Sequence, residues 1–290
     1  MWLPAYACDV LAQASVGVEE IIWYSAGARL QVEPGSFASL RPGDAVLAVD
    51  YFGRSPDAAF RQFAASRPDV LWIEDRAQAM APDAPAWGDP LLYSPRKLIG
   101  AADGGLLVSA APLPQPDAAY DPADDASLWA PEDVRSADPD GRAAEAWFPL
   151  FQQREAAFEV DRRPISRRTL EALSRVDAGT AIRRRRANYS RLLARLTDFA
   201  LWPDVRPDFA PLAFPVLIED RDQVVGLMGA RGLFCARHWS DLPCPKDGFP
   251  EAWALSARML SIPCDQRYDE EDMERAAEAL KAVARPARAF

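Results

Sequence analysis

VLWIEDRAQ (residues 70–78) and LLYSPRK (residues 91–97) are the two stretches that decide how this chain folds. Each begins as a short apolar run, typical of a buried strand, and ends in polar side chains. Further strands are predicted at residues 45–50 and 105–109, and a helix at 57–65. Strands that alternate with helices favour crossover connections and an α/β fold, with a mainly parallel sheet sandwiched by helices.

Polar residues follow the two central strands where each strand ends. Asp75 and Gln78 follow the first, and Ser94 stands three residues before Lys97 after the second. Ligands bind beyond the carboxyl ends of parallel strands, so we expect these residues to share one edge. A carboxylate for a pyridine nitrogen, a serine for a phosphate and a lysine for a Schiff base are what pyridoxal phosphate (PLP) needs. The sequence therefore predicts a PLP site.

Within this site Lys97 is the predicted catalytic residue, and Asp75, Gln78 and Ser94 are the predicted cofactor contacts. Gln78 would reach the phenolic oxygen of the ring. The glycines of DGG (residues 103–105) would let the chain turn without a side chain in the cofactor's slot. Each residue alone has a simpler interpretation, since an Asp after a strand often caps a helix and most lysines are surface charges.

Composition narrows the class of protein. The 290 residues carry a net charge of −10, which argues against nucleic-acid binding. The basic run RRRR (residues 183–186) could grip a phosphate, but the first turn of an exposed helix is the favoured interpretation. No apolar run approaches the ~18 residues of a membrane span. Four scattered cysteines and one histidine predict no metal site, and reduced thiols without a signal sequence predict a cytoplasmic protein.

The chain divides into three parts by composition. Residues 1–110 would form a large cofactor-binding domain, and the Pro/Asp-rich residues 111–145 a long loop or connector. Residues 146–290 would form a helical linker and a smaller α+β domain. In that part a helix is expected around residues 189–199 and a strand at 214–219.

Short motifs in a fixed order suggest a family. They are PAY (residues 4–6), VDYFG (49–53), IEDRAQ (73–78), SPRK to DGG (94–105), RANY (186–189), FPV (214–216), RGL with HW (231–239) and LSIP (260–263). In these motifs, over nearly its whole length, the chain resembles the DegT/DnrJ/StrS-type sugar aminotransferases, PLP enzymes of fold type I.

The resemblance implies a homodimeric aminotransferase that moves an amino group from an amino acid such as glutamate to a nucleotide-linked keto-sugar. Lys97 would be the Schiff-base lysine, Asp75 the pyridinium partner and Ser94 a phosphate ligand. His238 would lie near the mouth of the site as a substrate contact. Tyr6 and Tyr51 could line the same pocket, although tyrosines at strand ends are more often packing residues.

Three departures from the family stand out. The spacing from Ser94 to Lys97 is shorter than the family's commoner form. The chain lacks the family's N-terminal segment, whose helix start binds the cofactor phosphate, and Cys8 stands where many relatives place an aromatic ring. Either the recorded start lies inside a longer reading frame, which the intact catalytic residues favour, or a short protein binds PLP weakly. A non-catalytic scaffold is the alternative function. A sugar dehydratase is a third, disfavoured because that enzyme replaces the lysine with histidine.

Overall fold

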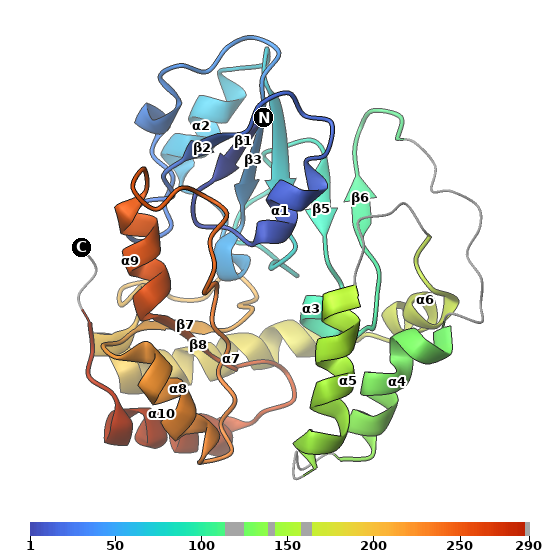
Figure 1. The fold of residues 1–290 in the computed structure, drawn as a ribbon, viewed down its shortest axis with the longest axis vertical. Coiled ribbons are helices and arrows are strands. Elements are labelled where there is room, and N and C mark those ends of the chain that lie inside the picture. The colour runs from blue at the N-terminus through green and yellow to red at the C-terminus, as the bar shows by residue number, and fades with distance from the viewer. Residues whose placement is uncertain (114–124, 139–142, 158–163, 288–290) are drawn as a thin grey trace.

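A six-stranded sheet forms the N-terminal part of the chain (Figure 1). The computed structural model describes residues 1–113, 125–138, 143–157 and 164–287. The strands of this sheet are β1 (Trp2–Pro4), β2 (Ile22–Tyr24), β3 (Ala45–Val49), β4 (Leu71–Asp75), β5 (Leu91–Tyr93) and β6 (Leu106–Val108). Their order is β2-β1-β3-β4-β5-β6, and every neighbouring pair is parallel except β5 and β6. The mainly parallel α/β sheet predicted from the sequence is thus confirmed.

The C-terminal part is built on a two-stranded antiparallel sheet of β7 (Phe214–Leu217) and β8 (Met259–Ile262). The helices are α1 (Asp9–Ala14), η1 (Pro34–Phe37), η2 (Tyr51–Gly53), α2 (Ala58–Ala65), α3 (Arg96–Ile99), α4 (Asp125–Ser136), α5 (Ala144–Ala157), α6 (Arg167–Ser174), α7 (Ala178–Leu196), η4 (Thr197–Phe199), α8 (Arg221–Gly229), α9 (Pro250–Arg258) and α10 (Glu270–Val283). The predicted strand at 214–219 and helix around 189–199 correspond to β7 and α7.

Strand β3 shows why the large sheet is buried on both faces. Its side chains alternate, so Val46 and Ala48 enter one apolar cluster while Leu47 and Val49 enter another. The first cluster is closed by Phe60 of α2. Apolar residues on both faces are typical of parallel strands covered by other elements on each side.

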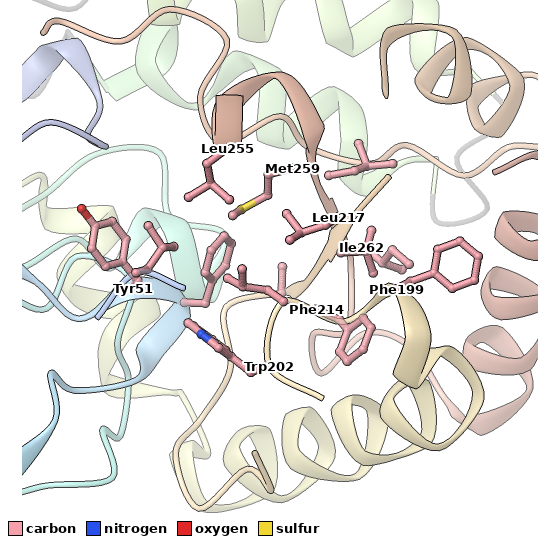
Figure 2. Packing of buried hydrophobic residues seen from close by; sticks show 14 of the residues in the cluster. Tyr51, Phe199, Trp202, Phe214, Leu217, Leu255, Met259 and Ile262 are labelled. Atoms are coloured by element: carbon pink, nitrogen blue, oxygen red, sulfur yellow. The ribbon is translucent and has the colours of Figure 1, made fainter. Parts of the chain in front are cut away.

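The second cluster is shared by the two sheets. It joins Leu3 and Leu47 of the large sheet to Leu192 of α7 and to Val216 and Leu260 of the small sheet. Figure 2 shows part of it, with Tyr51, Trp202, Phe214, Leu217 and Met259 side by side. One continuous core therefore holds the N-terminal and C-terminal parts together.

The predicted connector differs from the expected loop. Helix α4 lies within it and packs against α5, although Pro131 is inside α4. Helix α4 has apolar side chains that pack against other elements, such as the buried Trp129, which a solvent-exposed loop would lack. Residues 114–124 and 139–142 of the connector lie outside the described residues, and the three domain boundaries stay a prediction. In the part of the chain that the structure describes, no helix has both the length and the apolar character to cross a membrane.

Candidate active site

Asp75 ends β4 at the carboxyl edge of the large sheet. It is 6% exposed, and one carboxylate oxygen accepts a hydrogen bond from the Ala77 N–H at 2.8 Å. Among the described residues no cation forms an ion pair with it. Burial raises the pKa of Asp75, and the positive charge of Lys97 opposes part of that rise. A buried carboxylate without a cationic partner is suited to a protonated ring nitrogen.

Lys97 lies in the short helix α3, directly after β5. Its backbone N–H donates to the Ser94 carbonyl at 3.2 Å, and its side chain is exposed. No carboxylate in the described part of the chain pairs with its ammonium. The charge of Lys97 lowers the pKa of both Asp75 and His238. Asp75 and Lys97 therefore follow neighbouring parallel strands at the carboxyl edge of the large sheet.

Gln78 and Ser94 flank this pair. Gln78 is 2% exposed, and its side-chain oxygen accepts a hydrogen bond from the Phe52 N–H at 2.7 Å. The amide nitrogen has no acceptor within the described residues, so it is the atom that remains for a ligand. Ser94 is partly exposed, and its hydroxyl likewise has no partner there. Their predicted contacts with a cofactor remain a prediction.

Tyr6 and Tyr51 pack in the core instead of facing a cavity. Both side chains are almost completely buried, and the Tyr51 hydroxyl donates to the Tyr6 carbonyl. The Tyr6 hydroxyl donates to the His238 carbonyl and lies 3.3 Å from the sulfur of Met259. Because these hydroxyls are already satisfied, the structure favours the packing role for both tyrosines, and contact with a substrate stays a prediction.

His238 lies in the loop before α9 and contacts one residue next to the large sheet and one residue of the small sheet. Its ring contacts Phe52 edge to face at 5.4 Å between centroids, and Nδ1 lies 2.8 Å from the Ser261 hydroxyl. Burial lowers the pKa of His238 to about 4, with a further contribution from the charge of Lys97. The imidazole is therefore neutral at pH 7, and it can exchange a hydrogen bond with a ligand but supplies no positive charge.

The DGG turn has a different role from the one predicted. Asp103 accepts hydrogen bonds from the Ser166 N–H at 2.8 Å and from the hydroxyls of Ser166 and Thr169, and so it holds the start of α6. Gly104 has φ +99°, and a Cβ there would lie 2.5 Å from Cδ1 of Ile165. The glycine makes room for Ile165, so the expectation of a slot for the cofactor is wrong.

A buried charge cluster behind the site was missed. Glu74 is completely buried and accepts hydrogen bonds from Arg76 Nε at 2.6 Å and from the Trp87 and Gly88 N–H groups. Asp50 lies 3.9 Å from the same Nε, and burial together with the nearby Glu74 raises the pKa of its carboxyl. Acids at both strand ends were visible in the sequence, and strand alternation places Glu74 on the side of the sheet opposite to Asp75. The contact of Glu74 and Asp50 with the same arginine was not predicted.

Two surface hollows of the described chain lie away from this edge. One, of about 360 Å³, is bounded by Arg184, Arg191 and Glu270, and the other, of about 320 Å³, by Arg231 and Arg275. Neither includes a residue of the Asp75–Lys97 edge.

Comparison with known proteins yields matches only in structure. No protein-family model and no curated protein matches the sequence. A DegT/DnrJ/EryC1/StrS aminotransferase from Brucella abortus superposes with a TM-score of 0.61 at 15% identity, covering 97% of this chain and 78% of that chain. Spr1654 from Streptococcus pneumoniae, in its PLP form, gives 0.67 at 13%, covering 97% and 80%. A variant of the dehydratase ColD with bound GDP-perosamine gives 0.63 at 13%, covering 96% and 79%.

These matches define the class of fold. The chain has the α/β fold of the PLP-dependent fold type I sugar aminotransferases across nearly its whole length. The resemblance inferred from short motifs is confirmed at this level. Because an aminotransferase and a dehydratase match equally well, the fold alone does not select the reaction.

Proposed function

We propose that this protein is a PLP-dependent aminotransferase that moves an amino group from an amino acid such as glutamate to a nucleotide-linked keto-sugar. One observation carries the proposal. Asp75 is a buried carboxylate and Lys97 an exposed amine, and within the described residues neither forms an ion pair. Both lie at the same carboxyl edge of a parallel sheet, close enough for the charge of Lys97 to act on the pKa of Asp75.

The residues present fit the cofactor. Asp75 would hold the protonated ring nitrogen, Gln78 would donate its free amide N–H to the phenolic oxygen, and Ser94 would bind the phosphate. When bound, PLP supplies an electron sink for the carbon that exchanges the amino group. The fall in the pKa of Asp75 that a neighbouring cation causes would offset the rise due to burial.

Lys97 would then move the proton of the reaction through its Nζ atom. No ion pair holds this amine within the described residues, so the side chain of Lys97 could move to the position that proton transfer requires. The neutral imidazole of His238 adds no competing positive charge beside it. This mechanism would require a mobile amine, that of Lys97, and a fixed carboxylate, that of Asp75.

The finer parts of the proposal rest on the resemblance and on similar structures. A sugar-nucleotide substrate is supported by ColD, which was solved with bound GDP-perosamine. A lysine and not a histidine at position 97 favours amino transfer over dehydration. A homodimer in the cytoplasm completes the proposal, and the free thiols of all four cysteines agree with a reducing compartment.

A non-catalytic binding protein is the second candidate. It is favoured by the exposure of Lys97 and by the thiol of Cys8 where a ring-stacking aromatic would hold the cofactor. Burial raises the pKa of the Cys8 thiol, and the positive charge of Lys97 opposes part of that rise. Cys8 is thus within electrostatic range of Lys97.

Reduction with borohydride separates the two candidates. The chain has three lysines, Lys97, Lys246 and Lys281, all exposed, so attachment sites can be assigned by peptide mapping without ambiguity. We expect added PLP to colour the protein yellow and borohydride to fix the cofactor to Lys97. Lys97→Met should abolish both effects, and Lys281→Met should change neither. A colourless protein, or label spread equally over the three lysines, would favour the binding protein.

A further inference from the structure

Arg185, one of the four arginines of the basic run, lies inside the protein. It sits in the middle of α7 and is 2% exposed. Its guanidinium donates to the Leu98 carbonyl at 2.8 Å, to the carbonyls of Pro211 and Leu212 at 2.8 and 3.1 Å, and through Nε to the Gln266 side-chain oxygen at 2.7 Å. The expectation that the whole run lies on an exposed helix is wrong for this residue.

The Leu98 carbonyl receives a second donor from the C-terminal part of the chain. Gln266 Nε2 donates to it at 3.0 Å, so Arg185 and Gln266 together use both lone pairs of one oxygen. Leu98 directly follows Lys97 in α3. The last carbonyls of a helix have no hydrogen-bond donor inside the helix. For the Leu98 carbonyl, the side chains of Arg185 and Gln266 are the donors.

The other end of α3 is held as well. Arg96 forms a two-pronged ion pair with Glu155 of α5, with Nη2 2.9 Å from one carboxylate oxygen. The side chain of Leu98 is buried. Within α3, the residue before Lys97 and the residue after it are thus anchored, while the lysine side chain itself is exposed and unpaired.

Burying the charged side chain of Arg185 is unfavourable unless other interactions compensate. Burial lowers the pKa of Arg185, and the negative charge of Asp265 offsets only part of that effect. Within the described residues no carboxylate lies close enough to Arg185 for an ion pair. A buried charge without an anionic partner is unfavourable unless its hydrogen bonds are complete. The planar guanidinium reaches three carbonyls and one amide oxygen at once, which a lysine ammonium on a single stem cannot do.

We propose that Arg185, together with Gln266, is a positioning residue for Lys97. By holding the Leu98 carbonyl, the pair fixes the orientation of α3 on the sheet and so directs the lysine amine toward Asp75. Because both residues belong to the C-terminal part, docking of that part onto the sheet completes the lysine site. This inference rests on the proposed function, in which Lys97 is the residue that bonds the cofactor.

The first test needs no cofactor. Reductive methylation with ¹³C-formaldehyde gives each of the three lysines an NMR signal, and the signal missing from Lys97→Arg identifies Lys97. We expect Gln266→Glu to shift the Lys97 signal toward that of the unfolded chain while the signals of Lys246 and Lys281 stay in place. Glutamate keeps the acceptor for Arg185, loses the donor to Leu98 and adds one negative charge, whereas Gln266→Met loses the donor without adding a charge. A shift of the Lys97 signal in both variants would assign the effect to the lost donor, and a purely structural role predicts no shift in either.

The second test uses PLP. Gln266→Glu and Arg185→Lys should weaken PLP binding about tenfold or more, because a lost charge-assisted or amide hydrogen bond leaves the lysine misdirected. Arg185→Met is the stronger variant, and Arg185→Lys serves if Met does not fold. Arg186→Met is the matched control, since Arg186 donates to the carbonyls of Asp208 and Phe209 and does not reach α3.

The two proposals fail in different ways. If the unaltered protein binds no PLP, the proposed function fails, and the NMR test still decides whether Arg185 and Gln266 position Lys97. If the unaltered protein binds PLP through Lys97 but Gln266→Glu and Arg185→Lys match Arg186→Met in both measurements, the positioning role is overturned and the proposed function stands.

Discussion

Glu74 and Asp75 are neighbours in β4, yet their carboxylates meet opposite surroundings. Glu74 is fully buried and has an arginine and two backbone N–H groups as partners, whereas Asp75 accepts from one N–H and forms no ion pair in the described part of the chain. Strand alternation alone produces this division, because adjacent side chains face opposite sides of the sheet. One acid is satisfied within the protein, and the other is left for a ligand.

Replacing Asp75 should separate stability from binding. Because burial raises its pKa, the ionised form is penalised in the folded state, and stability falls as pH rises above the ordinary value of 3.8. Asp75→Asn should therefore raise the melting temperature of the cofactor-free protein at pH 7. It should weaken PLP binding about ten- to hundredfold, the value of a charge-assisted hydrogen bond. A lower melting temperature with unchanged PLP binding would contradict both parts.

His238 gives a second prediction at this scale. Its pKa is lowered from 6.5 to about 4, so the folded protein keeps it neutral while the unfolded chain binds a proton below pH 6.5. Stability should thus be lost as pH falls from 6.5 to 4, by up to about 3 kcal/mol from this residue. Denaturant unfolding at pH 7 and pH 4.5 should show a smaller loss in His238→Gln.

The pKa of His238 can be measured directly by NMR. The chain has one histidine, so its ring protons need no assignment by mutation in an NMR pH series. A midpoint near 6.5 in the folded protein would show that the ring is solvated and would remove the basis of the stability prediction.

Among the elements, four strands of the large sheet were predicted well from the sequence, whereas β2, β8 and the helix faces were not. Continuous apolar runs bounded by turn residues located β3, β4, β5 and β6 to within a residue or two. The run of four arginines hid the inward face of α7. Its buried positions are Ala181, Arg185, Asn188, Tyr189, Leu192 and Leu196. This spacing was a usable signal, since it places Arg185 one turn before Tyr189 on the apolar side.

The candidate site was predictable only as far as strand ends determine it. Parallel neighbours bring Asp75 and Lys97 to one edge whatever the rest of the chain does. The Asp103 turn, the buried hydroxyls of Tyr6 and Tyr51 and the contact from Arg185 to Leu98 depend on packing between segments more than 40 residues apart. No local pattern records such contacts.

The turn after β3 offers a test of element geometry. Gly53 has φ +94°, and a Cβ there would lie 2.5 Å from the Ala210 carbonyl oxygen, which is backbone and cannot move aside cheaply. Gly43 has φ +87° with nothing within 4 Å. We expect Gly43→Ala to cost about 1–2 kcal/mol for its left-handed backbone alone, and Gly53→Ala clearly more. Equal losses in urea unfolding would show that residues 208–212 do not pack on this turn.

For the whole molecule, the shared apolar core matters more than the division by composition. Leu3 and Leu47 of the large sheet belong to the same cluster as Leu260 of the small sheet. A core that continues across two sheets couples their unfolding, whereas separate domains would each have a core of their own. The same cluster docks the C-terminal part on the large sheet, and this docking places Arg185 within hydrogen-bond distance of the Leu98 carbonyl in α3.

Truncating Leu260 should therefore weaken both sheets. Leu260 is completely buried in β8, and Leu260→Ala should cost about 2–5 kcal/mol. Leu227→Ala is the control, since Leu227 is 37% exposed on α8 and should cost within about 0.5 kcal/mol. Hydrogen exchange followed by mass spectrometry should show equal losses of protection in peptides that cover β3 and β8, since both open in one global transition. Loss confined to β8 would instead mean that the two parts unfold independently, and that docking of the C-terminal part cannot control the lysine site.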